Sequence, residues 1–260
     1  MMGRRPRVLV LIPAHNEAAS LPTVVGGLRQ CRGDLDILVV NDGSTDGTST
    51  VLRQLGVRWL HWPERRGVGR ALRAGLRYAA RQGYDIVVRL DADGQHDVED
   101  VGRLLVHLHV GTADVVLGSR FASSSRVRSP GSVQRWLGAL LSLIVRRPVT
   151  DPTSGFWALG PRAVTLLAEH HPAGYPEPEL HLFLSRNAMR VVEVDVQWRA
   201  RLHGRSTLTP GRLVAAGARV LLAILIVPFR AAVTPSRRST GPAIAEQPFA
   251  SEPVAGATRD

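Results

Sequence analysis

The sequence predicts an α/β fold built on a largely parallel sheet with helices on both faces. Two observations lead to this prediction. Short runs of Val, Ile and Leu recur along the chain, and segments with helical periodicity separate them. The strand-like runs are apolar throughout, which is typical of parallel strands that are covered on both sides. A hydrophobic content of 44% over 260 residues supplies enough apolar material for such a core.

Strands and helices alternate along the first half of the chain. Strands are expected at residues 8–12, 37–40, 57–61, 85–90 and 114–117, and helices at 20–29, after the turn 41–47, at 70–81 and at 98–109. Ligands of a parallel sheet bind outside the carboxyl ends of its strands. The residues that directly follow each strand are therefore the candidates for function.

The pattern becomes looser after residue 121. Ser123–Pro130 is polar and is expected to be flexible, and the apolar segment Val133–Val145 follows it and ends at Arg146 and Arg147. Two interpretations of this segment stay open. It is an ordinary core helix, or it is a helix that lies on a membrane surface with its arginines at the level of the lipid headgroups.

A second apolar stretch, Leu213–Phe229, contains Arg219 near its middle. Its 17 residues lie at the lower end of the roughly 17–25 that cross a bilayer, so surface binding is favoured over spanning. The residues after it are rich in Ala, Pro, Ser and Thr, which predicts disorder. We therefore expect a globular domain at 1–210, an amphipathic, membrane-associated helix at 211–230 and a disordered tail at 231–260.

The charge balance points to partners that carry phosphate. All 33 basic residues are arginine and the net charge is +11, which suits a nucleotide, nucleic acid or an anionic membrane face. An aromatic content of 5% and the lack of a recognisable binding motif disfavour nucleic acid. The single cysteine, Cys31, excludes an internal disulfide and a cysteine zinc site. No signal-like apolar run precedes the first strand, which predicts a cytoplasmic location.

The acidic turn Asp91-Ala92-Asp93 is the most informative motif. It follows the strand expected at 85–90, and residues i and i+2 of an extended segment point the same way, so both carboxylates can face one cation. Hard oxygen ligands suit Mg²⁺ or Mn²⁺, and Gln95 could add a neutral oxygen. Two surface aspartates in a turn are the alternative interpretation.

Two other strand ends carry polar groups. Asp42 follows the strand at 37–40 and could reach a base or a ribose at the sheet edge, or it could instead form an Asx-turn or cap the next helix. Asp46 fits the capping role better. The first strand ends in Pro13–Glu17, where Glu17 could also cap a helix. Polar groups at three strand ends on one edge predict a nucleotide and metal site.

Taken together, the motifs resemble glycosyltransferase family 2, and most of all its polyprenol-phosphate (dolichol-phosphate) mannosyl and glucosyl transferases. The resemblance implies a GT-A (Rossmann-like) fold, a nucleotide-sugar donor of the GDP-mannose or UDP-glucose type, a divalent cation, Mg²⁺ or Mn²⁺, and inverting transfer to a polyprenyl phosphate. It implies a location on the inner face of the plasma membrane. The motifs that carry it are Ile12–Glu17, Val40–Thr48, Asp91–Asp97, Gly118–Phe121, Thr153–Phe156 and Arg201–Ser206.

The same resemblance implies a role for individual residues. The residues implied around the nucleotide sugar are Pro13, His15, Glu17, Val40, Asp42, Asp91, Ala92 and Asp93. The residues implied at the metal are Asp91, Asp93 and Gln95. The residues implied in catalysis are Asp93, Arg120 and Arg201, and the two arginines would act as phosphate ligands. Three positions depart from the family pattern, because His15 replaces a frequent Tyr, Asn41 a frequent Asp and Thr207 a frequent Lys. The last departure weakens the assignment of the acceptor, although Arg205 could compensate.

The acceptor decides whether a general base is needed. A lipid phosphate is already largely ionised near neutral pH, so positioning and charge neutralisation would supply most of the catalysis. A hydroxyl acceptor would need a carboxylate within about 3 Å, and the candidates are Asp151, Glu177 and Glu179. A family 2 transferase with a soluble acceptor and a non-catalytic nucleotide-sugar-binding module remain the alternatives.

Overall fold

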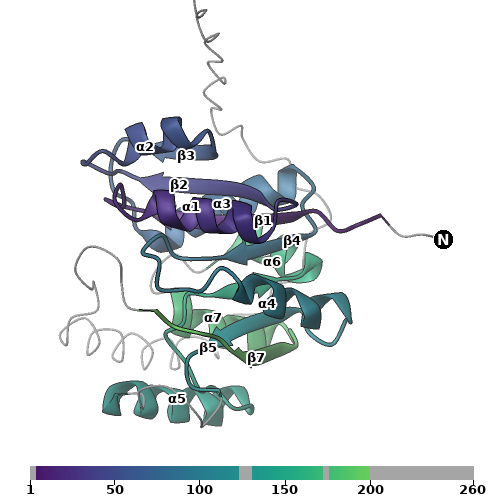
Figure 1. The fold of residues 1–260 in the computed structure, drawn as a ribbon. Coiled ribbons are helices and arrows are strands. Elements are labelled where there is room, and N and C mark those ends of the chain that lie inside the picture. The colour runs from purple at the N-terminus through teal and green to yellow at the C-terminus, as the bar shows by residue number, and fades with distance from the viewer. Residues whose placement is uncertain (1–3, 123–130, 172–175, 200–260) are drawn as a thin grey trace, which may run out of the picture.

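The computed structural model describes residues 4–122, 131–171 and 176–199. Over these residues the chain forms a seven-stranded sheet in the order β3-β2-β1-β4-β6-β5-β7, with helices on both faces (Figure 1). The largely parallel α/β architecture is therefore confirmed. Several predictions lie outside the described residues: the flexible stretch at 123–130, the roles of Arg201 and Arg205, the helix at 211–230 and the tail at 231–260.

The helices and strands follow the predicted order up to β5, and after β5 the structure contains elements that the sequence did not predict. The strands are β1 (Val8–Ala14), β2 (Asp36–Asp42), β3 (Arg58–Trp62), β4 (Ile86–Arg89), β5 (Val115–Ser119), β6 (Trp157–Leu159) and β7 (Val191–Asp195). The helices are α1 (Leu21–Cys31), α2 (Thr48–Leu55), α3 (Val68–Arg81), α4 (Asp100–His109), α5 (Ser132–Val145), α6 (Pro161–His170) and α7 (Pro176–Arg186). Four elements were not predicted from the sequence: β6, α6, α7 and β7.

The short strand β6 decides which loops meet at the functional edge. It pairs antiparallel with both β4 and β5, whereas the other pairs in the sheet are parallel. Trp157 stands opposite Arg89 on one side and opposite Leu117 on the other. Because β6 runs backwards, the loop that precedes it lies at the same edge as the carboxyl ends of its neighbours.

Alternate residues of the central strands face two separate apolar clusters. In β1, Val10 and Ile12 belong to the cluster under α1 and α4, and Leu9 and Leu11 belong to the cluster under α3 and α6. All four side chains are 1% exposed or less. Burial on both faces explains why these strands read as continuous apolar runs in the sequence.

Helix α5 lies at the β5–β7 end of the sheet (Figure 1) and has two different apolar faces. On one face Leu137 and Leu141 are buried in a small cluster with Leu182. On the other face Trp136 is 52% exposed and Leu143 is 78% exposed. The core-helix interpretation therefore holds for the first face, and the membrane-surface interpretation stays a prediction for the second. Among the described residues, no helix has the length and apolar character needed to span a membrane.

The two arginines after α5 do not act as a pair. Arg146 is exposed and begins the next turn in the left-handed region, with φ of +54°. Arg147 instead turns inward, where its Nη2 donates to Nδ1 of buried His181 at 2.9 Å. The expectation that both arginines lie at headgroup level is corrected for Arg147, because its guanidinium is hydrogen-bonded inside the fold.

Candidate functional site

The carboxyl edge of the sheet brings most of the predicted residues together. His15 follows β1, Asp42 ends β2, Asp91 and Asp93 follow β4, and Arg120 follows β5. These strands are neighbours or are separated only by β6. The predicted clustering of polar strand ends is therefore a feature of the fold.

The turn after β1 is fastened to the turn after β2. The Oδ1 atom of Asn16, whose φ is +58°, accepts a hydrogen bond from the Thr45 backbone N–H at 2.8 Å. The Nδ1 atom of His15 lies 2.8 Å from the carbonyl oxygen of Asp42. Because a carbonyl only accepts, Nδ1 carries a proton in this contact.

Asp42 holds a loop in place. Its Oδ1 and Oδ2 accept hydrogen bonds from the backbone N–H groups of Arg66 and Gly67, at 2.6 and 2.8 Å. These residues precede α3, so Asp42 fastens the loop that leads into that helix. It does not cap the next helix along the chain, α2, as the alternative interpretation expected. Gly43 makes this approach possible, since its φ is +63° and a Cβ there would stand 2.3 Å from the Arg65 nitrogen.

Four other residues predicted around the nucleotide sugar are engaged inside the fold. The side chains of Val40 and Ala92 are 0% and 3% exposed and belong to the two apolar clusters, so at most their backbone atoms can face a ligand. Pro13 pairs with Val40 across β1 and β2. Glu17 accepts a hydrogen bond from the Ser20 hydroxyl at 2.7 Å, just before α1. The Glu17 side chain thus contacts the residue that directly precedes α1.

Asp91 stands between a buried arginine and a buried histidine. Its Oδ1 lies 3.4 Å from Arg89 Nη2, and its Oδ2 lies 3.5 Å from His96 Nε2. Burial opposes ionisation of this carboxyl, but the Arg89 guanidinium and His96 outweigh it and hold the pKa of Asp91 well below its usual range. The site therefore offers a permanent negative charge at the end of β4.

Arg89 in turn has a second acidic partner. Its Nη2 donates to Oε1 of Glu177 on α7 at 2.6 Å, and both side chains are largely buried, with 7% and 13% exposed. Glu177 was a candidate general base, but in this structure its carboxylate neutralises Arg89. Glu179, another candidate, stands in the first turn of the same helix, where negative charge is favourable.

Asp93 is held by its own turn. The residue is 6% exposed, and its Oδ1 accepts from the Gln95 backbone N–H at 3.0 Å. The side-chain amide of Gln95 lies 2.9 Å from Asp93 Oδ2 and 3.1 Å from the indole Nε1 of Trp198. With its NH₂ group toward Asp93, both contacts are hydrogen bonds, and the reverse orientation sets acceptor against acceptor and donor against donor.

This orientation bears on the predicted metal ligands. The amide oxygen of Gln95 faces Trp198. Gln95 in this structure therefore supports Asp93 by a hydrogen bond, and its oxygen is not directed beside Asp93 as a further ligand for a metal ion. Among the described residues, no three His, Cys, Asp or Glu side chains form a ready-made metal cluster. Mg²⁺ is commonly held by one or two carboxylates together with substrate phosphates, and the side chains of Asp91 and Asp93 fit that mode of binding.

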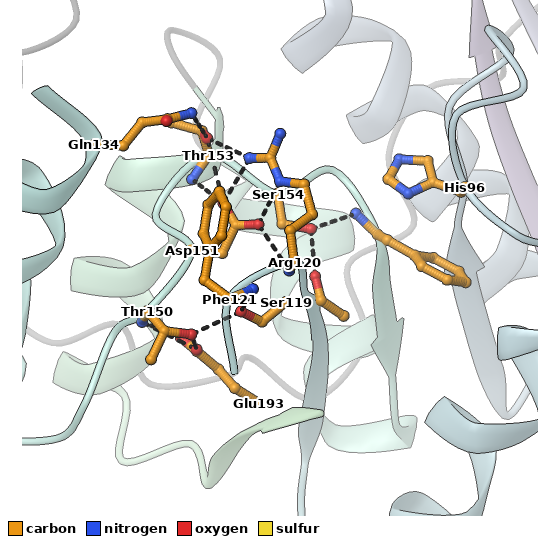
Figure 2. A network of polar contacts seen from close by, with 12 residues as sticks. His96, Ser119, Arg120, Phe121, Gln134, Thr150, Asp151, Thr153, Ser154 and Glu193 are labelled. Atoms are coloured by element: carbon orange, nitrogen blue, oxygen red, sulfur yellow. Dashed lines mark hydrogen bonds and ion pairs between the residues drawn. The ribbon is translucent and has the colours of Figure 1, made fainter. Parts of the chain in front are cut away.

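Arg120 is clamped by a buried carboxylate (Figure 2). Its Nε and Nη2 donate to Oδ2 and Oδ1 of Asp151 at 2.6 and 2.7 Å, and Nη2 also donates to the Thr153 hydroxyl at 2.8 Å. Asp151 is 0% exposed. These contacts use three of the five N–H donors of a guanidinium, and the other two are on Nη1. Asp151, which was a candidate general base, therefore anchors Arg120 in this structure.

The loop before β6 connects this clamp to neighbouring elements, as Figure 2 shows. Thr150 bonds to the Ser119 hydroxyl at the end of β5 and to the Glu193 carboxylate on β7. Burial raises the pKa of Glu193, although the hydrogen bonds from Thr150 work against it. On the other side, the Gln134 amide of α5 donates to Thr153 at 3.4 Å.

Sequence reasoning missed three residues of the site: Arg89, His96 and Trp198. An arginine inside an otherwise apolar strand, two residues before an acid, was a usable signal for Arg89. His96 lies within the acidic motif, but its contact with Asp91 depends on the turn geometry. Trp198 is about a hundred residues away from the acidic turn, and no local pattern indicates that it reaches Gln95.

Comparisons with known proteins give a consistent result. A model of the family described as glycosyl transferase family 2 matches residues 9–164. The chain is 36% identical over 219 residues to an undecaprenyl-phosphate mannosyltransferase of Micrococcus luteus. This match covers 79% of this chain and 88% of that protein. The chain is also 39% identical over 129 residues to a polyprenol monophosphomannose synthase of Mycolicibacterium smegmatis, covering 47% and 48% of the two chains.

Solved structures share the fold. A glucosyl-3-phosphoglycerate synthase from Mycobacterium tuberculosis, crystallised with Mn²⁺, uridine diphosphate and phosphoglyceric acid, superposes with a TM-score of 0.66. Its sequence is 25% identical, and the match covers 86% of this chain and 78% of that one. The same synthase has also been crystallised with Mg²⁺ and uridine diphosphate.

Proposed function

The chain belongs to glycosyltransferase family 2, and on that premise we propose that it moves a hexose from a nucleotide sugar to a polyprenyl phosphate at a membrane surface. The chain is a glycosyltransferase with the GT-A fold. The proposal adds a donor of the GDP-mannose or UDP-glucose type, dependence on Mg²⁺ or Mn²⁺ and inversion at the anomeric carbon. Its strongest support is the similarity to the undecaprenyl-phosphate mannosyltransferase along 88% of that relative's length.

The proposed reaction needs no proton transfer before attack. An ionised oxygen of the lipid phosphate attacks the anomeric carbon, and the bond from that carbon to the diphosphate oxygen breaks. The electron pair leaves with the nucleoside diphosphate, and the sugar is left on the phosphate with inverted configuration. The arrangement of carboxylates supports an acceptor of this kind, because Asp151 and Glu177, two candidate bases, are engaged by Arg120 and Arg89.

Charge neutralisation is the main task of the site in this proposal. A divalent cation at Asp91 and Asp93 would offset the negative charge that develops on the departing diphosphate. The low pKa of Asp91 keeps this residue ionised over the whole physiological range. Arg120, held rigidly by Asp151, would direct the N–H groups of Nη1 toward a phosphate of the donor or the acceptor.

The exposed face of α5 supports the proposed contact with a membrane surface. Trp136 and Leu143 are large apolar side chains in solvent, 52% and 78% exposed, and exposed Arg146 follows the same helix. Such a combination suits a helix that lies at the lipid interface. A lipid acceptor held in the bilayer could then reach the sheet edge without leaving its membrane.

Transfer to a defined acceptor tests the proposal. Full-length protein is incubated with Mn²⁺, radiolabelled GDP-mannose or UDP-glucose, and vesicles that contain undecaprenyl phosphate. We expect labelled glycolipid and one equivalent of nucleoside diphosphate, with both lost on chelation and in Asp93→Asn, while that variant keeps the wild-type Tm. Transfer only to a soluble hydroxyl acceptor, or none to any acceptor, contradicts the proposed function.

A further inference from the structure

Trp198 lies between the acidic turn and the arginine clamp. Its ring is 4.7 Å from the His96 ring, centroid to centroid, at an interplanar angle of 89°. The Arg120 guanidinium carbon lies 4.6 Å from the centroid of the same indole. A single half-buried side chain therefore contacts residues that follow β4 and β5.

The indole N–H is one of the two groups that orient the Gln95 amide, together with the Asp93 carboxylate. Nε1 is 3.1 Å from the Gln95 amide, and an indole nitrogen can only donate, so the amide presents its oxygen to Trp198. The NH₂ group is then directed at Asp93 Oδ2, 2.9 Å away. Trp198 thus fixes a hydrogen bond to Asp93 without touching that carboxylate.

The indole face bears on Arg120 in a different way. Asp151 holds one edge of the guanidinium, and the Trp198 ring supports its plane by a cation–π contact. Phe121 also lies near this guanidinium, with its ring centroid 5.2 Å away. The orientation of Nη1 is set by the carboxylate and the rings together.

The backbone around Trp198 is fastened to the same turn. His96 and Trp198 form an isolated antiparallel bridge, and the Arg199 N–H donates to the Gln95 carbonyl at 2.8 Å. The Arg199 guanidinium also donates to Asp97 Oδ2 at 2.6 Å. The indole is therefore held at a fixed position relative to the acidic turn.

We propose that Trp198 is a positioning residue that sets Asp93 through Gln95 and sets Arg120 through its ring face. The indole N–H and the indole face act separately, since one reaches the acidic turn and the other the clamp. This assignment deepens the proposed function and rests on it, because the proposed function gives Asp93 its role at the cation and Arg120 its role at a phosphate. The consequence is that one side chain fixes the spacing between a cation at Asp93 and a phosphate at Arg120.

Two substitutions separate these roles. Trp198→Phe keeps a ring for Arg120 and removes the N–H, and Trp198→Leu removes both. Mn²⁺ affinity is measured by calorimetry and by electron paramagnetic resonance with UDP, then with GDP, and the KM values for undecaprenyl phosphate and for the nucleotide sugar are measured in vesicles. Trp59→Phe on β3 is the matched control, and thermal unfolding of every variant reports on stability.

We expect Trp198→Phe to raise the Kd for Mn²⁺ about tenfold, because a Gln95 amide that has lost one of its two hydrogen bonds no longer holds Asp93 firmly in place. Its acceptor KM should stay within about twofold of wild type, whereas Trp198→Leu should raise both constants several-fold. Trp59→Phe should change neither constant. The proposal is overturned if Trp198→Phe binds Mn²⁺ as tightly as wild type or more tightly. It is also overturned if the Kd for Mn²⁺ and the acceptor KM change in parallel in Trp198→Phe as well as in Trp198→Leu.

The Mn²⁺ measurement uses no acceptor, so it distinguishes two kinds of failure. A wild-type protein that binds Mn²⁺ with a nucleotide but transfers no sugar to undecaprenyl phosphate contradicts the proposed acceptor only. The comparison of Trp198→Phe with wild type still decides whether the indole N–H positions Asp93. A normal KM for both the nucleotide sugar and the acceptor in Trp198→Leu would contradict the part of the proposal that concerns Arg120.

Discussion

Arg120 and Asp151 form a two-point ion pair between the end of β5 and the loop before β6. Nε and Nη2 of the arginine donate to separate carboxylate oxygens at 2.6 and 2.7 Å, and the Arg120 backbone N–H reaches Oδ2 at 3.1 Å. The aspartate is fully buried and the arginine side chain is 13% exposed. This geometry assigns Asp151 the task of fixing an arginine at the site.

Removing the charge of Asp151 should destabilise the fold as well as the site. In Asp151→Asn, the guanidinium keeps its buried position but loses its counter-charge, so the free energy of unfolding should fall by about 3–5 kcal/mol. Urea unfolding at constant pH measures this change. Asp34→Asn is the control, because the Asp34 side chain is 63% exposed in its pair with Arg32 and such pairs contribute about 1 kcal/mol or less. A loss as small as the control's would show that the clamp does not stabilise the fold.

Adding one methyl group at Gly155 should disturb Asp91. A Cβ at this position would stand 2.4 Å from Asp91 Oδ2 and 3.1 Å from Arg89 Nη2, so the carboxylate must move. We expect Gly155→Ala to lower kcat at least about tenfold, since small displacements of catalytic groups are costly. Gly102→Ala is matched, because a Cβ there meets nothing within 4 Å. Wild-type kcat in Gly155→Ala would show that the position of Asp91 does not matter.

Buried His181 should make the fold sensitive to mild acid. Burial lowers its pKa to about 3 and the Arg147 guanidinium adds to the effect, compared with an ordinary value of 6.5. The unfolded chain therefore binds the proton first, and stability that is complete above pH 6.5 is lost as the pH falls toward 3. At pH 5 the loss from this group is about 2 kcal/mol.

Denaturant unfolding between pH 7.5 and 5 measures this dependence. In His181→Gln, an amide oxygen can still accept from Arg147, and the decline of unfolding free energy with pH should become shallower. His109→Gln, at an exposed position, should leave the slope unchanged. Equal slopes in wild type and His181→Gln would mean that His181 does not resist protonation in the folded state.

The exposed face of α5 should determine binding to lipid. Trp136→Gln with Leu143→Gln removes two large apolar groups that are 52% and 78% exposed, so stability should change little. Each group would contribute about 1.5–3 kcal/mol if buried in a bilayer, and sedimentation with anionic vesicles should show at least about a tenfold weaker partition. Val106→Gln on α4 together with Val110→Gln, directly after that helix, is the control, because these side chains are also exposed. Equal partition of the two double variants would remove α5 from the membrane contact.

The predicted elements match up to β5 because their signals are local. The runs at β1, β2 and β4 are buried on both faces, so their apolar character does not depend on which strand lies beside them. The acidic turn was placed correctly for the same reason, since it directly follows β4. After Phe121 the helix α5 was also visible, but the pattern did not show that one of its faces packs on Leu182.

By itself, the sequence determined the α/β alternation, the family and the strand ends at which polar groups gather. Only the tertiary structure decided what those groups contact. A three-residue strand, β6, has too few residues to show a period, and its direction follows from pairing with β4 and β5. That reversed strand brings Asp151 to Arg120 and Gly155 to Asp91, and the bridge to His96 brings Trp198 to Gln95. Contacts between residues so distant along the chain are fixed by packing and long-range pairing, which leave no periodic trace in the local sequence.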